Sequence, residues 1–207
     1  ELVESGAISS DVEIREEQIQ PASFDLTLGT KIYKQTSSFL PAGRTEEEIL
    51  EETKAELDIE NLILEPGVIY LVELAENLKL PPDIRAYSNP KSSTGRDDIF
   101  VRLVAPHSEN YDAVPQGFEG KLFLEIITQS FPIRLTPGAS LIQIRFFRGN
   151  TDFNENAING IHMIEPLIYD RSGRPKENIS IHSLGTGRPG VVLTLNLKYG
   201  NKEGIVG

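Results

Sequence analysis

The chain has 207 residues, 39% of them hydrophobic and 25% charged, with a formal net charge of −11 at pH 7. This composition fits a globular protein of one large or two small domains, and no apolar run approaches membrane-spanning length. The acidic balance argues against nonspecific nucleic-acid binding, which needs a basic face. Because there is no cysteine, disulfides, a thiol nucleophile and cysteine-based zinc sites are excluded. The first residues, ELVESGAISS, lack a secretory signal, so we expect a cytoplasmic location.

Strand-like segments dominate the chain. They are rich in Ile, Val, Leu, Phe and Tyr and are bounded by Gly or Pro, a pattern typical of short strands joined by tight turns. We therefore predict a mainly β fold, either a barrel or a sandwich. The segments are ASFDLTLGTKIY, ENLILEPGVIYLVEL, GKLFLEIITQS, FPIRLTPGASLIQIRFF and GVVLTLNLKYG.

Two helices are predicted. The longer covers Arg44–Asp58, where Thr45 and Glu48 form a capping box and acidic residues fill the first turn. We interpret this longer helix as an insertion between strands. A shorter helix is predicted around Leu2–Glu4.

The domain organisation is predicted from a change in composition. Residues 1–148 form a β domain, and residues 149–184 are polar enough to be a connector. Residues 185–207 look like the start of a second, related β domain, because VVLTLNLK near the end echoes FDLTLGTK at residues 24–31. We expect the chain to be a truncated part of a longer protein.

One loop gathers groups that suit phosphate. In PKSSTGRDD, the residues Lys91, Ser92, Ser93 and Arg96 place an ammonium, two hydroxyls and a guanidinium within a few positions of each other. Hydroxyls donate hydrogen bonds to phosphate oxygens, and Arg offers a planar fork. A solvated turn is the alternative, because turns favour the same residue types.

A single carboxylate interrupts an apolar strand. Alternation in KLFLEIITQ puts Glu125 on the face of Phe123 and Ile127. A carboxylate there is costly unless it is paired, and a base that must later act as an acid needs such a balance of burial and charge. The alternative is an exposed glutamate on an edge strand, paired with Lys121 or Arg134.

Segments in this order and at these spacings resemble a known family. ASFDLTLG, LEPGVIYLVELAENLKLPPDI, PKSSTGRDDI, GFEGKLFLEI and LTPGASLIQIRFF are similar to segments of the dCTP deaminases, in the trimeric dUTPase-like superfamily. The resemblance implies a distorted jelly-roll β-barrel with a short helical insertion and a homotrimer with sites at subunit boundaries. It implies deamination of dCTP to dUTP and ammonia, which feeds dUMP and dTTP synthesis, with Mg²⁺ on the triphosphate and no zinc.

The resemblance also implies roles for residues. Glu125 occupies the position of the family's proton-shuttling glutamate, after the turn Gly117–Gly120. Ser92 matches the serine that positions the water, and Arg96 matches the arginine that stabilises developing charge. Lys91, Ser93 and Gly117 are expected to contact the substrate. No protein-held metal is predicted, since His107, His162 and His182 lack ligand spacing.

The chain departs from the family pattern at the sugar-binding turn. Pro115 stands where the family has an aspartate, and a proline side chain cannot accept a hydrogen bond. Asp112 could substitute, although a solvated loop residue is the simpler interpretation. The family's C-terminal closing segment is not evident, so a two-half protein with composite sites is one hypothesis. Two rival functions stay open: a dUTP pyrophosphatase on the same fold, and a non-catalytic scaffold or nucleotide-sensing half.

Overall fold

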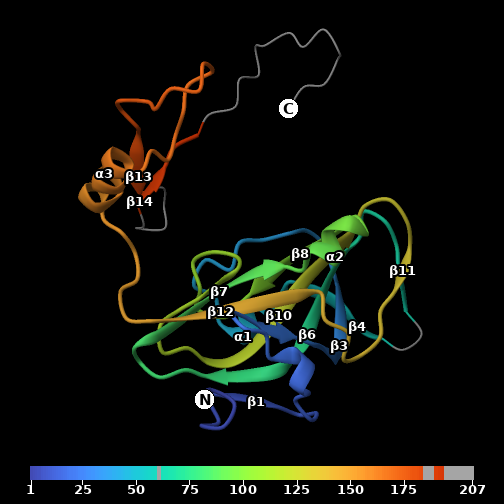
Figure 1. The fold of residues 1–207 in the computed structure, drawn as a ribbon. Helices are drawn as coiled ribbons and strands as arrows, with labels where there is room; N and C mark the ends of the chain where they lie inside the picture. The colour runs from blue at the N-terminus through green and yellow to red at the C-terminus, as the bar shows by residue number, and fades with distance from the viewer. Residues whose placement is uncertain (60–61, 184–188, 194–207) are drawn as a thin grey trace, which may run out of the picture. The chain divides into compact units, whose positions relative to one another are not determined.

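The structure is a computed structural model that describes residues 1–59, 62–183 and 189–193. The chain divides into two compact units, Glu1–Gly149 and Asn150–Gly207. Strands far outnumber the few short helices of the first unit, as Figure 1 shows, so the prediction of a mainly β fold is confirmed. No helix among the described residues is long and apolar enough to cross a membrane.

The first unit is built on two sheets. The larger has the order β4-β3-β6-β10-β8, with β1 also paired to β6, and the second has the order β2-β12-β7-β9. A separate pair, β5 and β11, completes the strands of this unit. The bounds in the larger sheet are β1 Ile8–Ser10, β3 Leu28–Gln35, β4 Thr53–Asp58, β6 Ile69–Lys79, β8 Ile99–Val104 and β10 Glu119–Thr128. The others are β2 Phe24–Leu26, β5 Ile63–Leu64, β7 Ile84–Pro90, β9 Ala113–Val114, β11 Ile133–Arg134 and β12 Ile142–Arg148.

Side chains from both sheets share one apolar core. Alternation along β10 sends Leu122, Leu124 and Ile126 into this core, where they are fully buried. The opposite face of the same strand carries Phe123 and Glu125. That face has a second, smaller apolar cluster, formed by Tyr33, Ile49, Leu71, Val104 and Phe123. Glu125 therefore lies on the outer face of the larger sheet, beside this second cluster.

The helix predicted over Arg44–Asp58 is only half correct. Helix α1 (Glu46–Glu51) begins at the capping box as expected, with Thr45 Oγ1 accepting from the Glu48 N–H at 3.3 Å. The rest is strand β4, which pairs antiparallel with β3. Pairing with the edge of β3 outweighs the helix propensity of this sequence, because the strand gains a ladder of backbone hydrogen bonds. The helix predicted at Leu2–Glu4 is also wrong: it is a hydrogen-bonded turn before β1.

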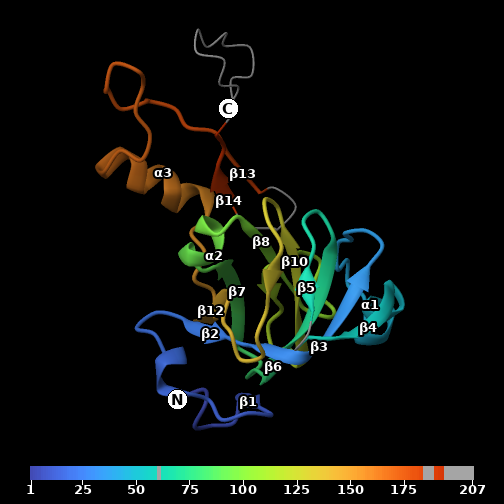
Figure 2. The same ribbon diagram turned by 90° about the vertical axis from the view of Figure 1, so that its right-hand side faces the viewer.

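Two short helices accompany the strands of the first unit. The 3₁₀ helix η1 (Glu16–Gln18) precedes β2, and α2 (Ser92–Arg96) connects β7 to β8. Figure 2 shows α2 where β7 and β8 meet. This placement puts the loop predicted to bind phosphate at one end of the larger sheet.

The second unit is small. It holds helix α3 (Glu155–Ile164) and the pair β13 (Ile181–Ser183) and β14 (Pro189–Val191). The imidazole of His162 uses both nitrogens inside this unit: Nδ1 accepts from the Leu167 N–H at 2.9 Å, and Nε2 lies 2.6 Å from the Lys176 carbonyl. The stretch predicted as a connector thus contains a helix, while the predicted domain boundaries stay a prediction. Most of the echo at residues 191–198 lies outside the described residues.

Candidate active site

Glu125 is held in the middle of β10 and is 1% exposed. In the ladder it lies opposite Arg102 of β8 on one side and Leu71 of β6 on the other. Arg102 Nε donates to Glu125 Oε1 at 3.1 Å, and its Nη2 donates to the same oxygen. Burial of this glutamate rules out the exposed edge-strand alternative. Its partner is Arg102, and neither Lys121 nor Arg134 takes that place.

Ser38, in the segment between β3 and α1, covers the carboxylate. Its hydroxyl lies 3.0 Å from Glu125 Oε2 and 3.2 Å from Oε1. Tyr111 lies behind it, with its hydroxyl 3.1 Å from Ser38 Oγ and donating to the Phe39 carbonyl. Burial raises the pKa of the Tyr111 phenol, and the hydrogen bond with Ser38 partly offsets that rise. Tyr111 therefore acts here as a neutral hydrogen-bonding group.

The groups predicted on the phosphate loop lie on α2 and just before it. Ser92, Ser93 and Arg96 are exposed to solvent. Lys91 is half-buried, caps the start of α2 and forms an ion pair with Asp25 of β2, which is 7% exposed. This pair borders a cavity of about 410 Å³ that is also lined by Gln143 and residues 20–23. The Lys91 ammonium, the Ser23 hydroxyl and the amides of Gln20 and Gln143 can donate hydrogen bonds to an anion such as phosphate, although Asp25 already pairs with Lys91.

A single chain does not bring Glu125 together with Ser92 and Arg96. Helix α2 ends at Arg96, before β8 begins, and Glu125 pairs with Arg102 further along that strand. From Ile99 to Arg102 alone the strand spans about 10 Å, at roughly 3.3 Å per residue. The two predicted halves of the site are thus separate clusters within the described residues of one chain.

The turn before β10 is held in place by the backbone conformation and the hydrogen bond of Gly117. Gly117 has a φ of +69°, which favours glycine, and its N–H donates to the Ile84 carbonyl at 3.0 Å. A side chain at this position would meet Pro82 at 3.4 Å. These observations give Gly117 a role in the turn, and its predicted contact with substrate stays a prediction.

Asp112 is not a solvated loop residue. Its Oδ1 accepts from the Leu103 N–H at 2.9 Å and from the Ser88 hydroxyl at 3.0 Å. Burial raises the pKa of this carboxyl, and the two hydrogen bonds only partly offset the rise. Asp112 therefore ties β7 to β8, which leaves its Oδ1 committed to the fold.

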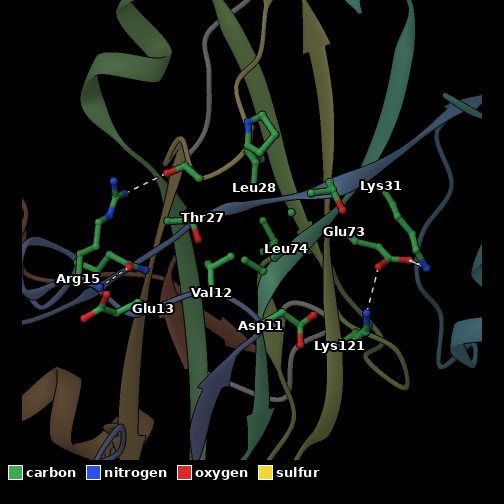
Figure 3. Close-up of a pocket in the computed structure, with 16 residues that line it drawn as sticks. Asp11, Val12, Glu13, Arg15, Thr27, Leu28, Lys31, Glu73, Leu74 and Lys121 are labelled. Carbon is green, nitrogen blue, oxygen red and sulfur yellow. Dashed lines mark hydrogen bonds and ion pairs between the residues drawn. The ribbon is translucent and has the colours of Figure 1, made fainter. Parts of the chain in front are cut away.

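A separate hollow of about 360 Å³ is lined by residues of β3, β6 and the segment after β1, as Figure 3 shows. The β3–β6 and β6–β10 ladders both have register shifts next to it, and the buried carboxylate of Glu73 is part of its lining. Glu73 pairs with Lys121 at 3.1 Å and Lys31 at 3.5 Å, and accepts from the Tyr33 hydroxyl at 3.0 Å. The carboxylate raises the pKa of Lys121, so this ammonium stays charged. Each of these polar groups therefore has a hydrogen-bond or ion-pair partner within the cluster.

Sequence reasoning missed three residues of these clusters. The contact of Arg102 with Glu125 depends on the β8–β10 register, which a connection of 14 residues, 105–118, leaves unspecified. Ser38 reaches Glu125 across a sequence separation of 87 residues, and no local signal marks it. Asp25 did carry a signal, because it is a lone carboxylate in the apolar strand SFDLTL.

The fold and the glutamate cluster define a class before any particular relative is considered: mainly β proteins with a buried, arginine-paired carboxylate on one strand of a sheet. The profile of the 2′-deoxycytidine 5′-triphosphate deaminase (DCD) N-terminal domain matches residues 1–150. The chain therefore belongs to the dCTP deaminase family.

Individual relatives agree with this assignment. The dUMP-forming dCTP deaminase of Methanobrevibacter smithii is 32% identical over 151 residues, which cover 70% of this chain and 75% of that protein. The dCTP deaminase of Ignicoccus hospitalis is 28% identical over 135 residues, covering 64% and 71%. The crystal structure of the deaminase from Agrobacterium tumefaciens matches with a TM-score of 0.69 and 39% identity, over 82% of this chain and 52% of that one. The chain thus spans about half the length of the Agrobacterium protein.

Proposed function

We propose that this protein deaminates dCTP by hydrolysis, with Glu125 in place of a metal-bound hydroxide. The observation that carries the proposal is the carboxylate of Glu125, 1% exposed and held by Arg102 and Ser38 in a chain of this family. A chain without cysteine cannot build the cysteine-containing zinc site of other cytidine deaminases. A positioned carboxylate can activate water without a metal.

In the proposed reaction Glu125 carries one proton in two steps. Glu125 takes a proton from water as the water oxygen bonds to the amino-bearing carbon of the cytosine ring and the electron pair of the ring carbon–nitrogen double bond moves onto N3. Glu125 then gives that proton to the amino nitrogen, the bond to this nitrogen breaks, and ammonia leaves as the ring double bond re-forms. The proton still on the added hydroxyl shifts to N3, which gives dUTP. General acid–base catalysis of this kind is worth about 100- to 10,000-fold in rate. The resemblance assigns Ser92 to orient the water and Arg96 to stabilise the negative charge that develops.

The triphosphate is proposed to bind beside α2. Lys91 and Ser93 supply a cation and a hydroxyl there, next to the cavity that Asp25 and Gln143 border. We propose that Mg²⁺ arrives on the triphosphate and neutralises part of its charge.

The site is proposed to be completed by a second copy of the chain in a homotrimer. Within one chain, the exposed Ser92 and Arg96 lie beyond the start of β8, away from the buried Glu125. Phe100, next to the Glu125 cluster on β8, is 45% exposed, which leaves an apolar surface for a neighbour to cover. The alternative source of the missing groups is a second half of the same polypeptide.

The final product is a separate question. The Methanobrevibacter and Methanosphaera stadtmanae relatives are dUMP-forming dCTP deaminases, at 32% and 34% identity. This similarity supports a second candidate function, in which dUTP formed by deamination also loses pyrophosphate. The two functions differ in whether dUTP or dUMP accumulates.

The test replaces the glutamate. The protein is incubated with dCTP and Mg²⁺, and ammonia, dUTP, dUMP and pyrophosphate are measured. Glu125→Gln keeps the shape of the side chain but cannot take up the proton, so we expect dCTP affinity within about threefold and turnover reduced at least 100-fold. Glu119→Gln is the matched control, because Glu119 is an exposed residue of the same strand, paired with Lys79 at the surface.

The products of this assay distinguish the candidate functions. Ammonia from the wild-type protein and its loss in Glu125→Gln support deamination. Pyrophosphate from added dUTP without ammonia from dCTP would point to the pyrophosphatase. Nucleotide binding with no turnover in the wild type would point to the scaffold or sensing half, and unchanged turnover in Glu125→Gln would remove this residue from the mechanism.

A further inference from the structure

We propose that Arg102 is a positioning residue that anchors one oxygen of Glu125 and leaves the other for proton transfer. The inference rests on the proposed deamination and adds a division of labour within the carboxylate. Oε1 is the anchored atom, because Arg102 Nε, at 3.1 Å, and Nη2 both donate to it. Oε2 accepts from the Ser38 hydroxyl at 3.0 Å.

Two N–H groups of the planar Arg102 guanidinium contact the carboxylate of Glu125. Two N–H groups on the same oxygen fix the position of Oε1 more firmly than a single ammonium would. Glu125 and Arg102 also lie directly opposite each other on neighbouring strands, so their backbones hold the pair at a fixed separation. The position of Oε1 is therefore set by the sheet through Arg102, while the Ser38 hydroxyl contacts Oε2.

Arg102 is itself held in place from its other sides. Its guanidinium carbon lies 4.0 Å from the centroid of the Tyr111 ring and 5.0 Å from that of Phe100. Its Nη2 also donates to Ser38 Oγ. Such contacts stabilise a cation over aromatic faces and reduce its freedom to leave the carboxylate. A mobile surface arginine would lack this arrangement.

Oε2 is the oxygen that Arg102 does not contact. Ser38 is exposed, and its hydroxyl accepts from Arg102 while donating toward Glu125 Oε2. This is the pair of hydrogen bonds that a water molecule at the same place would make. The proposal therefore assigns the proton transfer to Oε2, because both Arg102 donors occupy Oε1.

The kinetic test compares arginine variants in the dCTP assay. Arg102→Gln removes the charge and the fork, and we expect kcat to fall at least 100-fold with KM changed less than about threefold, because a misplaced base slows chemistry without weakening binding. Arg102→Lys restores the charge but not the fork, so about a tenfold loss of kcat is expected. Arg134→Gln, the same change at an exposed arginine of β11, should leave both constants unchanged.

A second measurement is independent of activity and covers the case in which Arg102→Gln folds poorly. Removing Arg102 leaves the buried carboxylate of Glu125 without a partner, which is strongly destabilising. In the Glu125→Gln variant position 125 is uncharged, so the loss of Arg102 leaves no buried carboxylate without a partner. We expect Arg102→Gln to lower the melting temperature by several degrees in the wild-type background, and by less than about 2 °C in the Glu125→Gln background.

These measurements test the positioning role of Arg102 separately from the proposed deamination. If the wild type releases no ammonia, deamination fails, and the melting temperatures still decide whether Arg102 anchors Glu125. If the wild type is active, kcat within threefold of wild type in both arginine variants overturns the positioning role. A loss confined to KM overturns it as well, since it would make Arg102 a substrate contact. Equal melting shifts in the two backgrounds would contradict the anchoring contact itself.

Discussion

Glu76 shows how this fold uses a carboxylate far from the candidate site. It is fully buried in β6 and accepts from the Thr27 N–H at 2.9 Å, the Thr27 hydroxyl at 2.7 Å and Gln18 Nε2 at 2.8 Å. These bonds tie η1 and β2 to the larger sheet. Burial still raises the pKa of Glu76 above its ordinary value of 4.5, because the hydrogen bonds offset only part of the desolvation.

A pH dependence of stability follows from that raised pKa. The folded protein binds this proton more tightly than the unfolded chain, so the contribution of Glu76 is fully present below pH 4.5 and is lost as pH rises through the raised pKa. Urea unfolding at a series of pH values should show the wild type losing stability over this window relative to Glu76→Gln, which cannot titrate there. Each unit of raised pKa is worth about 1.4 kcal/mol. A difference between the two proteins that does not change with pH would contradict the argument.

At the residue scale, the sequence identifies isolated carboxylates better than their partners. Glu125 is recognisable because an apolar strand rarely carries one charged residue without a reason. Its partner depends on which strand lies alongside. Lys121 shares the face of Glu125 but pairs with Glu73, and Arg134 lies on β11, which pairs with β5. Arg102 becomes the partner only through the register of β8 against β10, which tertiary packing decides.

The close approach of β3 and β6 is the element-scale feature most sensitive to substitution. Between Leu28 and Ile32 the register of this pair shifts, and Gly29 lies against the backbone of β6 there. A Cβ at Gly29 would stand 2.8 Å from the Glu73 carbonyl oxygen, a contact that only a backbone shift could relieve. The absence of a side chain at this position lets the strands meet beside the hollow.

Gly29→Ala should therefore destabilise the first unit. We expect a loss of about 1–3 kcal/mol in the free energy of unfolding, the usual cost of forcing atoms into a packed site. Gly95→Ala is the matched control, since Gly95 of α2 has nothing within 4 Å of the added carbon. Chemical denaturation of both variants measures the difference, and equal midpoints would show that the strands separate at little cost.

The segment after Thr45 forms first helix α1 and then strand β4, and the difference between them shows which elements a sequence can predict. Helix α1 begins where the capping box predicts, because a cap is a local interaction between Thr45 and Glu48. The helix ends early because β4 pairs with β3, and the open edge of a distant strand leaves no trace in the local pattern. Leu57, expected on the helix, instead packs against the main core from β4.

At the scale of the whole molecule, the sequence predicts the class of fold but not the assembly of the site. Strand composition and turn residues are enough for a mainly β unit, because these signals repeat along the chain. The joining of Glu125 with Ser92 and Arg96 does not follow from one chain, in which β8 separates them. The proposed homotrimer would supply these groups from a neighbouring subunit, and two variants test that proposal.

The decisive experiment mixes two inactive proteins. Glu125→Gln lacks the proton acceptor and Arg96→Gln lacks the exposed guanidinium of α2, so each alone should have little deaminase activity. If each site takes Glu125 from one subunit and Arg96 from the next, subunits exchanged at equal amounts rebuild intact sites with a probability of about one quarter, and activity should return to about 25% of wild type. Ammonia release by the refolded or co-expressed mixture measures this recovery. A mixture no more active than the two variants assayed separately would show that neighbouring subunits do not share the site, because a site built within one chain cannot be repaired by its neighbour.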